Sequence, residues 1–327
     1  MAPVVTDSRT PVHEADFAFL NDHLPHAITL LRRLQFSRFP QDSTENAHFL
    51  FASDPDSPTG SPGRSHFAAA YLDLSKGPET EMYFYSTLED YKDLSVLAEE
   101  EVKRVLDIIV ALFQRVKAVA ESTLSSGVHK LHRDYGVMVG GFHQAIYQLL
   151  CERRGFTSSY WNPHDVWLFR LERLPALSEG LMSLQGEGYR EHGLRWDVVQ
   201  KEDCPLIASR TKIPKIEATL MSEPSVVIRD AKGTLVAWAF MGVAGTLSTL
   251  HVEEAYRGKG IAKALTSKVF REHSFGDDGW GEAALLFARW IFGADMVIGS
   301  ADVHVDNIQS QAVCKSSGAE KGWRTSW

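Results

Sequence analysis

A short glycine-rich turn in the last third of the chain carries the residue types that bind phosphate groups. It reads Arg257-Gly-Lys-Gly-Ile-Ala262, after a predicted strand over 246–252 and before a predicted helix over 261–272. Glycines let the backbone come close to a ligand, and the first N–H groups of a helix have no partner within the helix. The helix dipole favours negative charge there, and Arg257, Lys259 and Lys263 add cationic donors. The spacing fits an anion site, with a solvated basic turn as the alternative.

Other phosphate loops and other chemistries fit the chain poorly. A Walker loop needs Ser or Thr after its lysine, but Ala264 follows Lys263; a dinucleotide fingerprint needs a third glycine where Lys263 stands. The chain has neither the G-x-S-x-G turn of many serine hydrolases nor H-E-x-x-H or clustered metal ligands. We therefore expect no metal site.

Two segments together resemble a known superfamily. The first segment resembles the acyl-coenzyme A (acyl-CoA) pyrophosphate loop of the GNAT superfamily of N-acyltransferases. It reads Val-Glu-Glu-Ala-Tyr-Arg257-Gly-Lys-Gly-Ile-Ala-Lys-Ala-Leu. The second segment, further along the chain, is similar to the next strand and helix of that superfamily. It reads Val-His-Val-Asp-Asn307-Ile-Gln-Ser-Gln-Ala-Val-Cys314-Lys-Ser-Ser-Gly. The ordered pair covers roughly the C-terminal two-fifths of the chain.

The resemblance implies how acetyl-CoA, or another acyl-CoA, is held as co-substrate. The strand before the turn bonds the pantetheine arm through its backbone, the turn holds the pyrophosphate, and an Asn side chain at the next helix contacts the cofactor. Carried onto this sequence, the cofactor-binding residues are Leu250, His251, Val252, Arg257, Gly258, Lys259, Gly260, Ile261, Ala262, Lys263, Asn307 and Ser310.

The catalytic residues are less clearly marked. Acyl transfer to an amine needs a base for the amine, an N–H donor for the thioester oxygen and a proton for the thiolate. Family members often carry a Glu at about positions 246–248, where this chain has Thr-Leu-Ser. Another acid occurs in some members at the position of Asp302, and a Tyr often stands at the position of Cys314. The candidate catalytic residues are Asp302, His304, His251 and Cys314, each with a purely structural role as the alternative.

Composition limits the partners and the compartment. The net charge of −8 argues against a general nucleic-acid binder. No run of about 18 apolar residues predicts a membrane span, and the N-terminal residues do not resemble a secretory signal. The three cysteines, Cys151, Cys204 and Cys314, form no C-x-x-C pair, which suits a reducing compartment. We expect a cytoplasmic protein whose partners are an acyl-CoA and a small amine; the sequence leaves the oligomeric state open.

The order of predicted elements indicates an α/β (α+β) protein of two GNAT-like lobes, each a mixed, mostly antiparallel sheet flanked by helices. The lobes are 1–178, a degenerate copy in which 136–142 carries no phosphate turn, and 179–327, the acyl-CoA-binding domain. An unrelated α/β lobe is the alternative for the first. Residues 1–15 are expected to be a loosely ordered tail, and 281–291 an extra helix. The layout resembles the glycine N-acyltransferase branch.

These observations predict an acyl-CoA-dependent N-acyltransferase that acts on a small amine or amino acid by direct transfer, with acetyl-CoA as the donor. The alternative is a CoA-binding GNAT-fold sensor or scaffold without catalysis, which the missing Glu and Tyr would suit.

Overall fold

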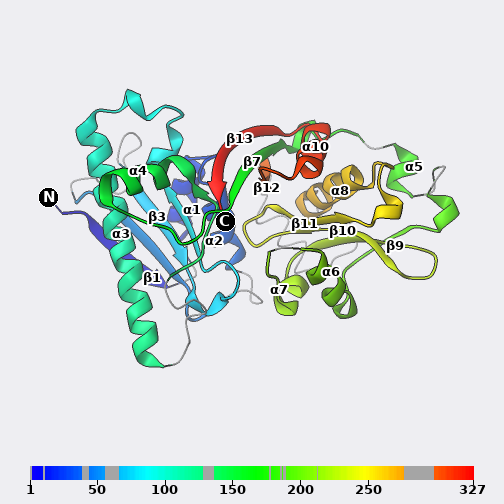
Figure 1. The fold of residues 1–327 in the computed structure, drawn as a ribbon, viewed down its shortest axis with the longest axis horizontal. Coiled ribbons are helices and arrows are strands. Elements are labelled where there is room, and N and C mark those ends of the chain that lie inside the picture. The colour runs from blue at the N-terminus through cyan, green and yellow to red at the C-terminus, as the bar shows by residue number, and fades with distance from the viewer. Residues whose placement is uncertain are drawn as a thin grey trace. The chain divides into compact units, whose positions relative to one another are not determined.

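The computed structural model describes residues 2–9, 12–38, 44–55, 66–127, 136–176, 178–184, 186, 189–211, 213–275 and 298–327. The chain divides into two compact units (Figure 1). Unit 1 comprises Met1–His164 together with Arg324–Trp327, and unit 2 comprises Asp165–Trp323. The helix expected over 281–291 lies outside the described residues.

Unit 1 is built on a five-stranded sheet in the order β1-β2-β3-β4-β5. Its strands are antiparallel except for the parallel pair β4 and β5. The elements in chain order are β1 (Val4–Arg9), α1 (Glu14–Asn21), α2 (Ile28–Phe36), β2 (His48–Ser53), β3 (Phe67–Leu72), β4 (Met82–Ser86), α3 (Glu99–Ser126), β5 (Val139–Gly140), β6 (Phe142–His143) and α4 (Gln144–Arg154).

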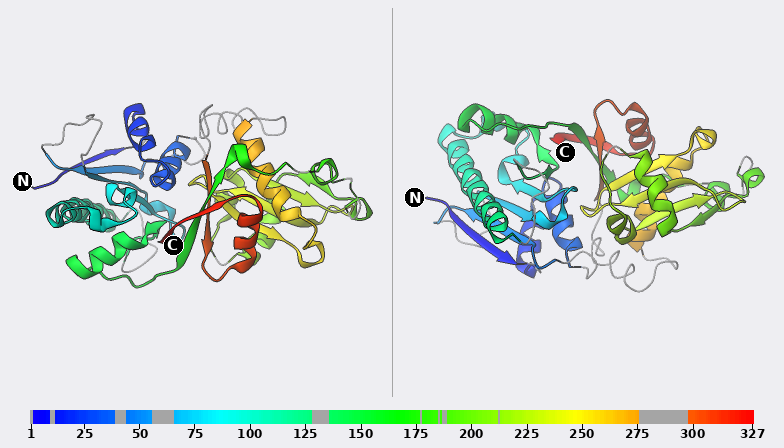
Figure 2. Two further views of the ribbon diagram at one scale, coloured as in Figure 1. Left: turned by 90° about the horizontal axis from the view of Figure 1, so that it is seen from above. Right: turned by 60° about the horizontal axis from the view of Figure 1, so that its bottom comes forward.

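The long helix α3 forms the core of unit 1 with this sheet. Val105, Leu106, Ile109 and Leu112 recur at helical spacing, are fully buried and pack with Leu50 and other apolar side chains of the strands. Figure 2 shows α3 running across the strands. One apolar face of α3 is therefore buried against this sheet.

The expectation of a loosely ordered N-terminal tail is wrong. Val4–Arg9 forms the edge strand β1, which pairs antiparallel with β2 along its whole length. Asp7 accepts hydrogen bonds from Arg115 Nε at 2.9 Å and lies 2.7 Å from His48 Nδ1. A long-range backbone ladder and these charges order the segment, and neither is visible as local apolar periodicity.

Unit 2 contains a four-stranded antiparallel sheet, β11-β10-β9-β8, and a second sheet in which β12, β7 and β13 are neighbours. Its elements are β7 (Pro163–Arg170), α5 (Glu179–Met182), β8 (Arg195–Asp197), α6 (Cys204–Arg210), α7 (Glu217–Ser222), β9 (Ser225–Arg229), β10 (Leu235–Met241), β11 (Leu247–Val252), α8 (Ile261–Phe275), β12 (Ile298–His304), α10 (Ile308–Ser316) and β13 (Glu320–Ser326).

Helices cover both faces of the four-stranded sheet of unit 2 (Figure 1). On one face Trp238 and Phe240 of β10 pack with Ile207 of α6 and Leu220 of α7. On the opposite face lies α8, against β9, β10 and β11. Side chains of β10 therefore alternate between the α6/α7 face and the α8 face.

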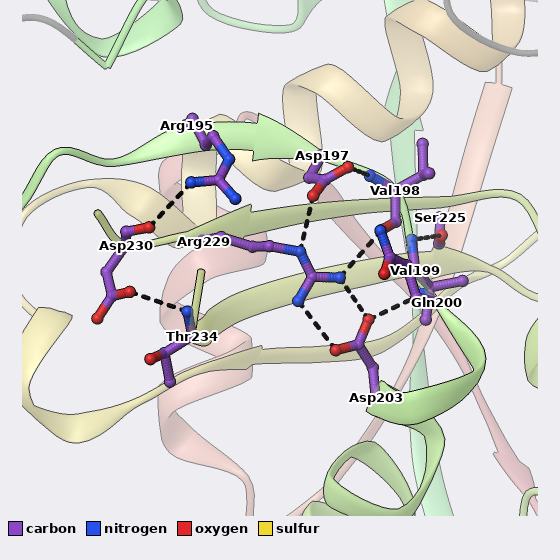
Figure 3. Close-up of polar contacts among 10 residues, drawn as sticks. All are labelled: Arg195, Asp197, Val198, Val199, Gln200, Asp203, Ser225, Arg229, Asp230 and Thr234. Carbon is purple, nitrogen blue, oxygen red and sulfur yellow. Dashed lines mark hydrogen bonds and ion pairs between the residues drawn. The ribbon is translucent and has the colours of Figure 1, made fainter. Parts of the chain in front are cut away.

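A buried ionic network fixes the edge of this sheet (Figure 3). Arg229 at the end of β9 donates to Asp203 through Nη1 at 2.9 Å and Nη2 at 2.5 Å, and to Asp197 of β8 through Nε at 2.7 Å. Asp203 also accepts from the backbone N–H of Gln200 at 2.8 Å. One guanidinium thus joins β8, β9 and the turn that begins α6.

The last residues of the chain complete unit 1. Thr325 and Ser326 of β13 pair antiparallel with His143 and Phe142 of β6. The ring of Trp327 packs edge-on to Tyr83 with centroids 6.1 Å apart. Sheet and helices in both units confirm the expected fold class, two lobes with mixed, mostly antiparallel sheets.

Candidate active site

The glycine turn adopts a conformation that demands glycine. Gly258 and Gly260 have φ values of 77° and 80°, in the left-handed region that L side chains rarely adopt. They lie between a short 3₁₀ turn, Glu254–Tyr256, and the start of α8 at Ile261. The turn therefore leads directly into α8, whose first N–H groups point out of the helix N-terminus, as an anion site requires.

The cations of the turn differ in their surroundings. Arg257 Nε donates to the carbonyl of Val252 at 2.8 Å and so ties the turn to the end of β11. Lys259 lies half-buried, with Nζ 3.1 Å from His192 Nε2. Lys263 stands half-buried in the first turn of α8, beside Ile261 and Ala262. The structure thus groups three positive charges around the free N–H groups.

A bulge interrupts β11 just before this turn. Trp238 pairs with His251, but Phe240 pairs with Ser248, so β11 has one residue more than β10 between these pairs. Thr249 within the bulge has φ of 51°. A β-branched residue in this region is strained by about 1–2 kcal/mol. Such strain clusters at functional sites, and a bulge frees backbone groups of β11 from the ladder.

The neighbouring strand β12 touches β11 at one point. Thr246, just before β11, forms a parallel bridge with Ser300 of β12, and the described residues show no further pairing between these strands. The two strands therefore diverge toward their carboxyl ends. The bulge of β11 and the glycine turn lie at the open end.

Three of the four candidate catalytic residues share one side of this opening. Ser248 and His251 lie on the face of Trp238 and Phe240, because paired residues of a ladder share a face. On β12, a Cβ at Gly299 would lie 2.5 Å from Phe270 of α8, so Gly299 faces α8. Alternation then turns Asp302 and His304 away from α8, toward the same side as His251.

The environment of His251 keeps its imidazole neutral. The ring stacks on Trp238 with centroids 4.6 Å apart. Burial lowers the pKa of His251 below its usual 6.5; the nearby Glu253 opposes this shift, and Arg257 and Arg210 reinforce it. Glu253 Oε1 lies 3.6 Å from Nε2, and no described residue forms a hydrogen bond with that nitrogen. A neutral imidazole can accept a proton.

The downstream motif forms the start of α10. Asn307 is the N-cap, and its Oδ1 accepts from the N–H of Ser310 at 3.0 Å. His304 Nδ1 accepts from the N–H of Asp306 at 3.1 Å, which orders the same turn. Asn307 is exposed, so its amide nitrogen can still meet a ligand.

Cys314 lies apart from these groups. It sits in α10 with 2% of its surface exposed. Burial raises the pKa of its thiol to about 12, so the group stays protonated at neutral pH.

Two residues that contact the turn were absent from the sequence-based set. The hydroxyl of Tyr189 donates to the carbonyl of Lys259, and His192 lies beside the ammonium group of the same residue. Both precede β8, roughly seventy residues before the turn along the chain. No local pattern marks them, because only the tertiary fold brings this segment to the loop.

In unit 1, the segment between a strand and the long helix is acidic. There β4 leads through a 3₁₀ turn to α3, as β11 leads to α8, and β5 runs parallel to β4. The segment between β4 and α3 is 87–98. Its carboxylates bond within the chain: Glu89 accepts from Ser86 N–H at 3.0 Å, and Asp90 accepts from Tyr85 Oη at 2.7 Å. The first turn of α3 holds Glu99, Glu100 and Glu101.

Two other classes of site were sought in the described residues. No group of three or more His, Cys, Asp or Glu side chains there could hold a metal ion. Among the helices that the structure describes, none is long and apolar enough to cross a membrane.

Comparison with protein families supports an acyltransferase that uses an acyl-CoA. Residues 5–170 match the family model described as the acyl-CoA N-acyltransferase verG N-terminal domain, and the chain belongs to this family. The match covers the N-terminal half, so it includes neither the glycine turn nor Asp302. No curated protein matches the chain in a sequence search.

A search of solved structures found several similar chains. A Drosophila protein superposes with a TM-score of 0.58 at 14% identity, covering 98% of both chains. A tandem GNAT protein from the clavulanic acid biosynthesis pathway gives 0.49 at 12% identity, covering 99% of this chain and 97% of the other. A GCN5-related N-acetyltransferase from Sphaerobacter thermophilus gives 0.48 at 14% identity, covering 99% and 94%. At these identities the likeness concerns the fold alone.

Proposed function

We propose that unit 2 transfers an acyl group from an acyl-CoA to the amine of a small molecule or amino acid, by direct transfer, with acetyl-CoA as donor. The observation that carries this proposal is the bulge of β11 at Thr249, placed between the divergent strands and the glycine turn. It supplies backbone donors near the point where a thioester would lie if its diphosphate bound at the turn.

The donor fits the residues of the chain as follows. The N–H groups at Gly260–Lys263 and the cations of the turn bind the diphosphate. The backbone of Leu250, His251 and Val252 pairs with the amides of the pantetheine arm. Asn307 and Ser310, on the other side of the opening, contact the same arm. A freed N–H of the bulge then donates to the thioester oxygen, whose charge grows as the amine attacks.

Asp302 is the general base in this proposal. It is half-buried on β12, beyond the Thr246–Ser300 bridge and on the side of Ser248. Its carboxylate takes a proton from the attacking amine, directly or through one water. The amine nitrogen adds to the thioester carbon, the C–S bond then breaks as the carbonyl re-forms, and the leaving thiolate takes up a proton from water. His304 and His251 share the face and assist this proton transfer.

A second function is favoured by one specific observation. Thr246, just before β11, and Ser248 on β11 stand where a Glu is common in the family. A protein that binds acyl-CoA without turnover, as a sensor or scaffold, would need no base. Turnover across an amine panel separates the two functions.

The test measures thiol release from acetyl-CoA with a panel of small amines and amino acids. Asp302→Asn should lower kcat about 10²–10⁴-fold with an unchanged affinity for CoA, as expected for a lost general base. Glu320→Gln on β13 is the control, because this side chain is 69% exposed and belongs to none of the proposed site residues. Equal rates in the wild type and Asp302→Asn would refute the base assignment. Binding without turnover of any amine would favour the scaffold.

We propose the cytoplasm as the location, because all three cysteines are free thiols in the structure. Recovery of the protein from an oxidising compartment, in fractionated cells, would contradict this.

A further inference from the structure

The segment that precedes β8 lies against the cofactor turn. The hydroxyl of Tyr189 donates to the carbonyl oxygen of Lys259, the residue between the two glycines of the turn. Nε2 of His192 lies 3.1 Å from the Nζ of the same lysine. One segment therefore contacts both the backbone and the side chain of Lys259.

This segment is itself held in place. The carbonyl of His192 accepts from the N–H of Ala231, in the turn between β9 and β10, at 3.0 Å. Its imidazole meets the ring of Tyr256 edge-on, with centroids 5.3 Å apart. Gly193 follows with φ of 56°, and a Cβ there would lie 2.7 Å from that of Ala231. The close approach fixes where Tyr189 and His192 stand.

The bond from Tyr189 sets the direction of a neighbouring N–H. In a planar trans peptide the C=O and N–H groups point to opposite sides. The carbonyl of Lys259 points to Tyr189, so the N–H of Gly260 points away from it. A Cβ on Gly260 would lie 3.6 Å from Leu181 and 3.9 Å from the Tyr189 hydroxyl, so the segment lines that side of the turn. The open side is left for a ligand.

The two side chains suit these roles chemically. Burial raises the pKa of Tyr189, so its hydroxyl remains a donor. The ammonium of Lys259 donates, so Nε2 of His192 must carry the lone pair. This contact holds the end of a flexible lysine side chain at the turn, which reduces the entropy lost when the lysine binds an anion.

We propose that Tyr189 and His192 are positioning residues for the diphosphate of the acyl-CoA: Tyr189 aims the N–H of Gly260 at it, and His192 holds the Lys259 ammonium beside it. The inference rests on the proposed function of unit 2. It assigns the segment before β8 a share in cofactor affinity without contact to the acyl group.

The test compares CoA with pantetheine, which lacks the diphosphate. Tyr189→Phe and His192→Ala should each weaken CoA binding about three- to tenfold by calorimetry, the equivalent of one ordinary hydrogen bond. His192→Gln retains an acceptor and should lose less than His192→Ala. Pantetheine affinity, followed by ligand-observed NMR, should stay unchanged in all three. Tyr160→Phe, at a tyrosine 57% exposed in unit 1, is the control.

The outcomes separate this inference from the proposed function. If the wild type fails to bind CoA, the proposed function fails. If the wild type binds CoA and the variants bind it equally well, only the positioning roles are overturned. Equal losses for CoA and pantetheine would also overturn them, because they would indicate a general distortion of unit 2. Thermal melting confirms that each variant is folded.

Discussion

Replacement of Arg229 by methionine should destabilise unit 2 strongly. The guanidinium makes three hydrogen bonds to the carboxylates of Asp197 and Asp203, at 2.5–2.9 Å. Its side chain is 8% exposed, and those of Asp203 and Asp197 are 10% and 26% exposed. Removal of the arginine leaves the Asp203 carboxylate buried with no cation beside it (Figure 3).

The expected cost follows from these exposures. Loss of one partner of a buried ion pair costs about 3–5 kcal/mol, because the other charge stays desolvated. Asp197 is exposed enough to regain water, and Asp203 keeps its bond from Gln200, so about 3 kcal/mol is expected. Arg229→Met combined with Asp203→Asn should recover part of this loss, because the buried charge is then removed.

Hydrogen exchange resolved by peptide is the suitable assay. The chain has two units, so one global free energy of unfolding is not well defined. Amides of β8 and β9 should lose protection equivalent to about 3 kcal/mol, while those of β2 and β3 in unit 1 keep theirs. Glu217→Gln is the matched control in the same unit, since it breaks the exposed Lys201–Glu217 pair, 2.9 Å long, at a cost below about 1 kcal/mol. Equal effects of Arg229→Met and Glu217→Gln would refute the reasoning.

Three further predictions concern strain, packing and protonation. Thr249→Gly should stabilise unit 2 by about 1 kcal/mol in denaturant melts, since it relieves the positive φ, yet lower turnover; lower stability would contradict the strain. Gly140→Ala should destabilise unit 1 by about 1–3 kcal/mol, because its Cβ would lie 2.6 Å from the Trp327 ring. Gly136→Ala is the control, because the space around Gly136 is open. Equal melting temperatures of the two variants would contradict this prediction. Burial lowers the pKa of His143 to about 4, and the charge of nearby His26 adds to this effect, so the folded state resists protonation of His143. Stability should be full above pH 6.5 and fall by about 3 kcal/mol towards pH 4, and His143→Asn should reduce that slope, because His26 then remains as the buried histidine.

Local signals in the sequence were sufficient for much of the fold. The apolar stripe of α3 and the break between α1 and α2 around Pro25 follow from periodicity and proline chemistry. The glycine turn was recognisable because Gly258 and Gly260 mark backbone conformations that other residues avoid. These features depend on a few consecutive residues.

Features that depend on distant pairing could not be read in the same way. The strand β1 exists because Val4–Arg9 finds β2 some forty residues away. The bulge at Thr249 is set by the register of β10 and β11, and threonine gives no hint of a positive φ. The contacts of Tyr189 and His192 with Lys259 likewise need the folded sheet. The face shared by Asp302 and His251 follows from alternation only after β12 is known to lie beside β11.

The most direct test of the account is a calorimetric titration of the full chain with CoA. We expect one site per chain, since the segment after β4 in unit 1 presents carboxylates where the turn of unit 2 presents cations. Gly260→Asp adds a negative charge at the turn and should weaken binding at least about tenfold. Gly155→Asp, at a glycine of φ 66° with open space around it, is the control and should bind as the wild type does. Absence of binding, two sites per chain, or equal affinity of Gly260→Asp and the wild type would contradict the central claim.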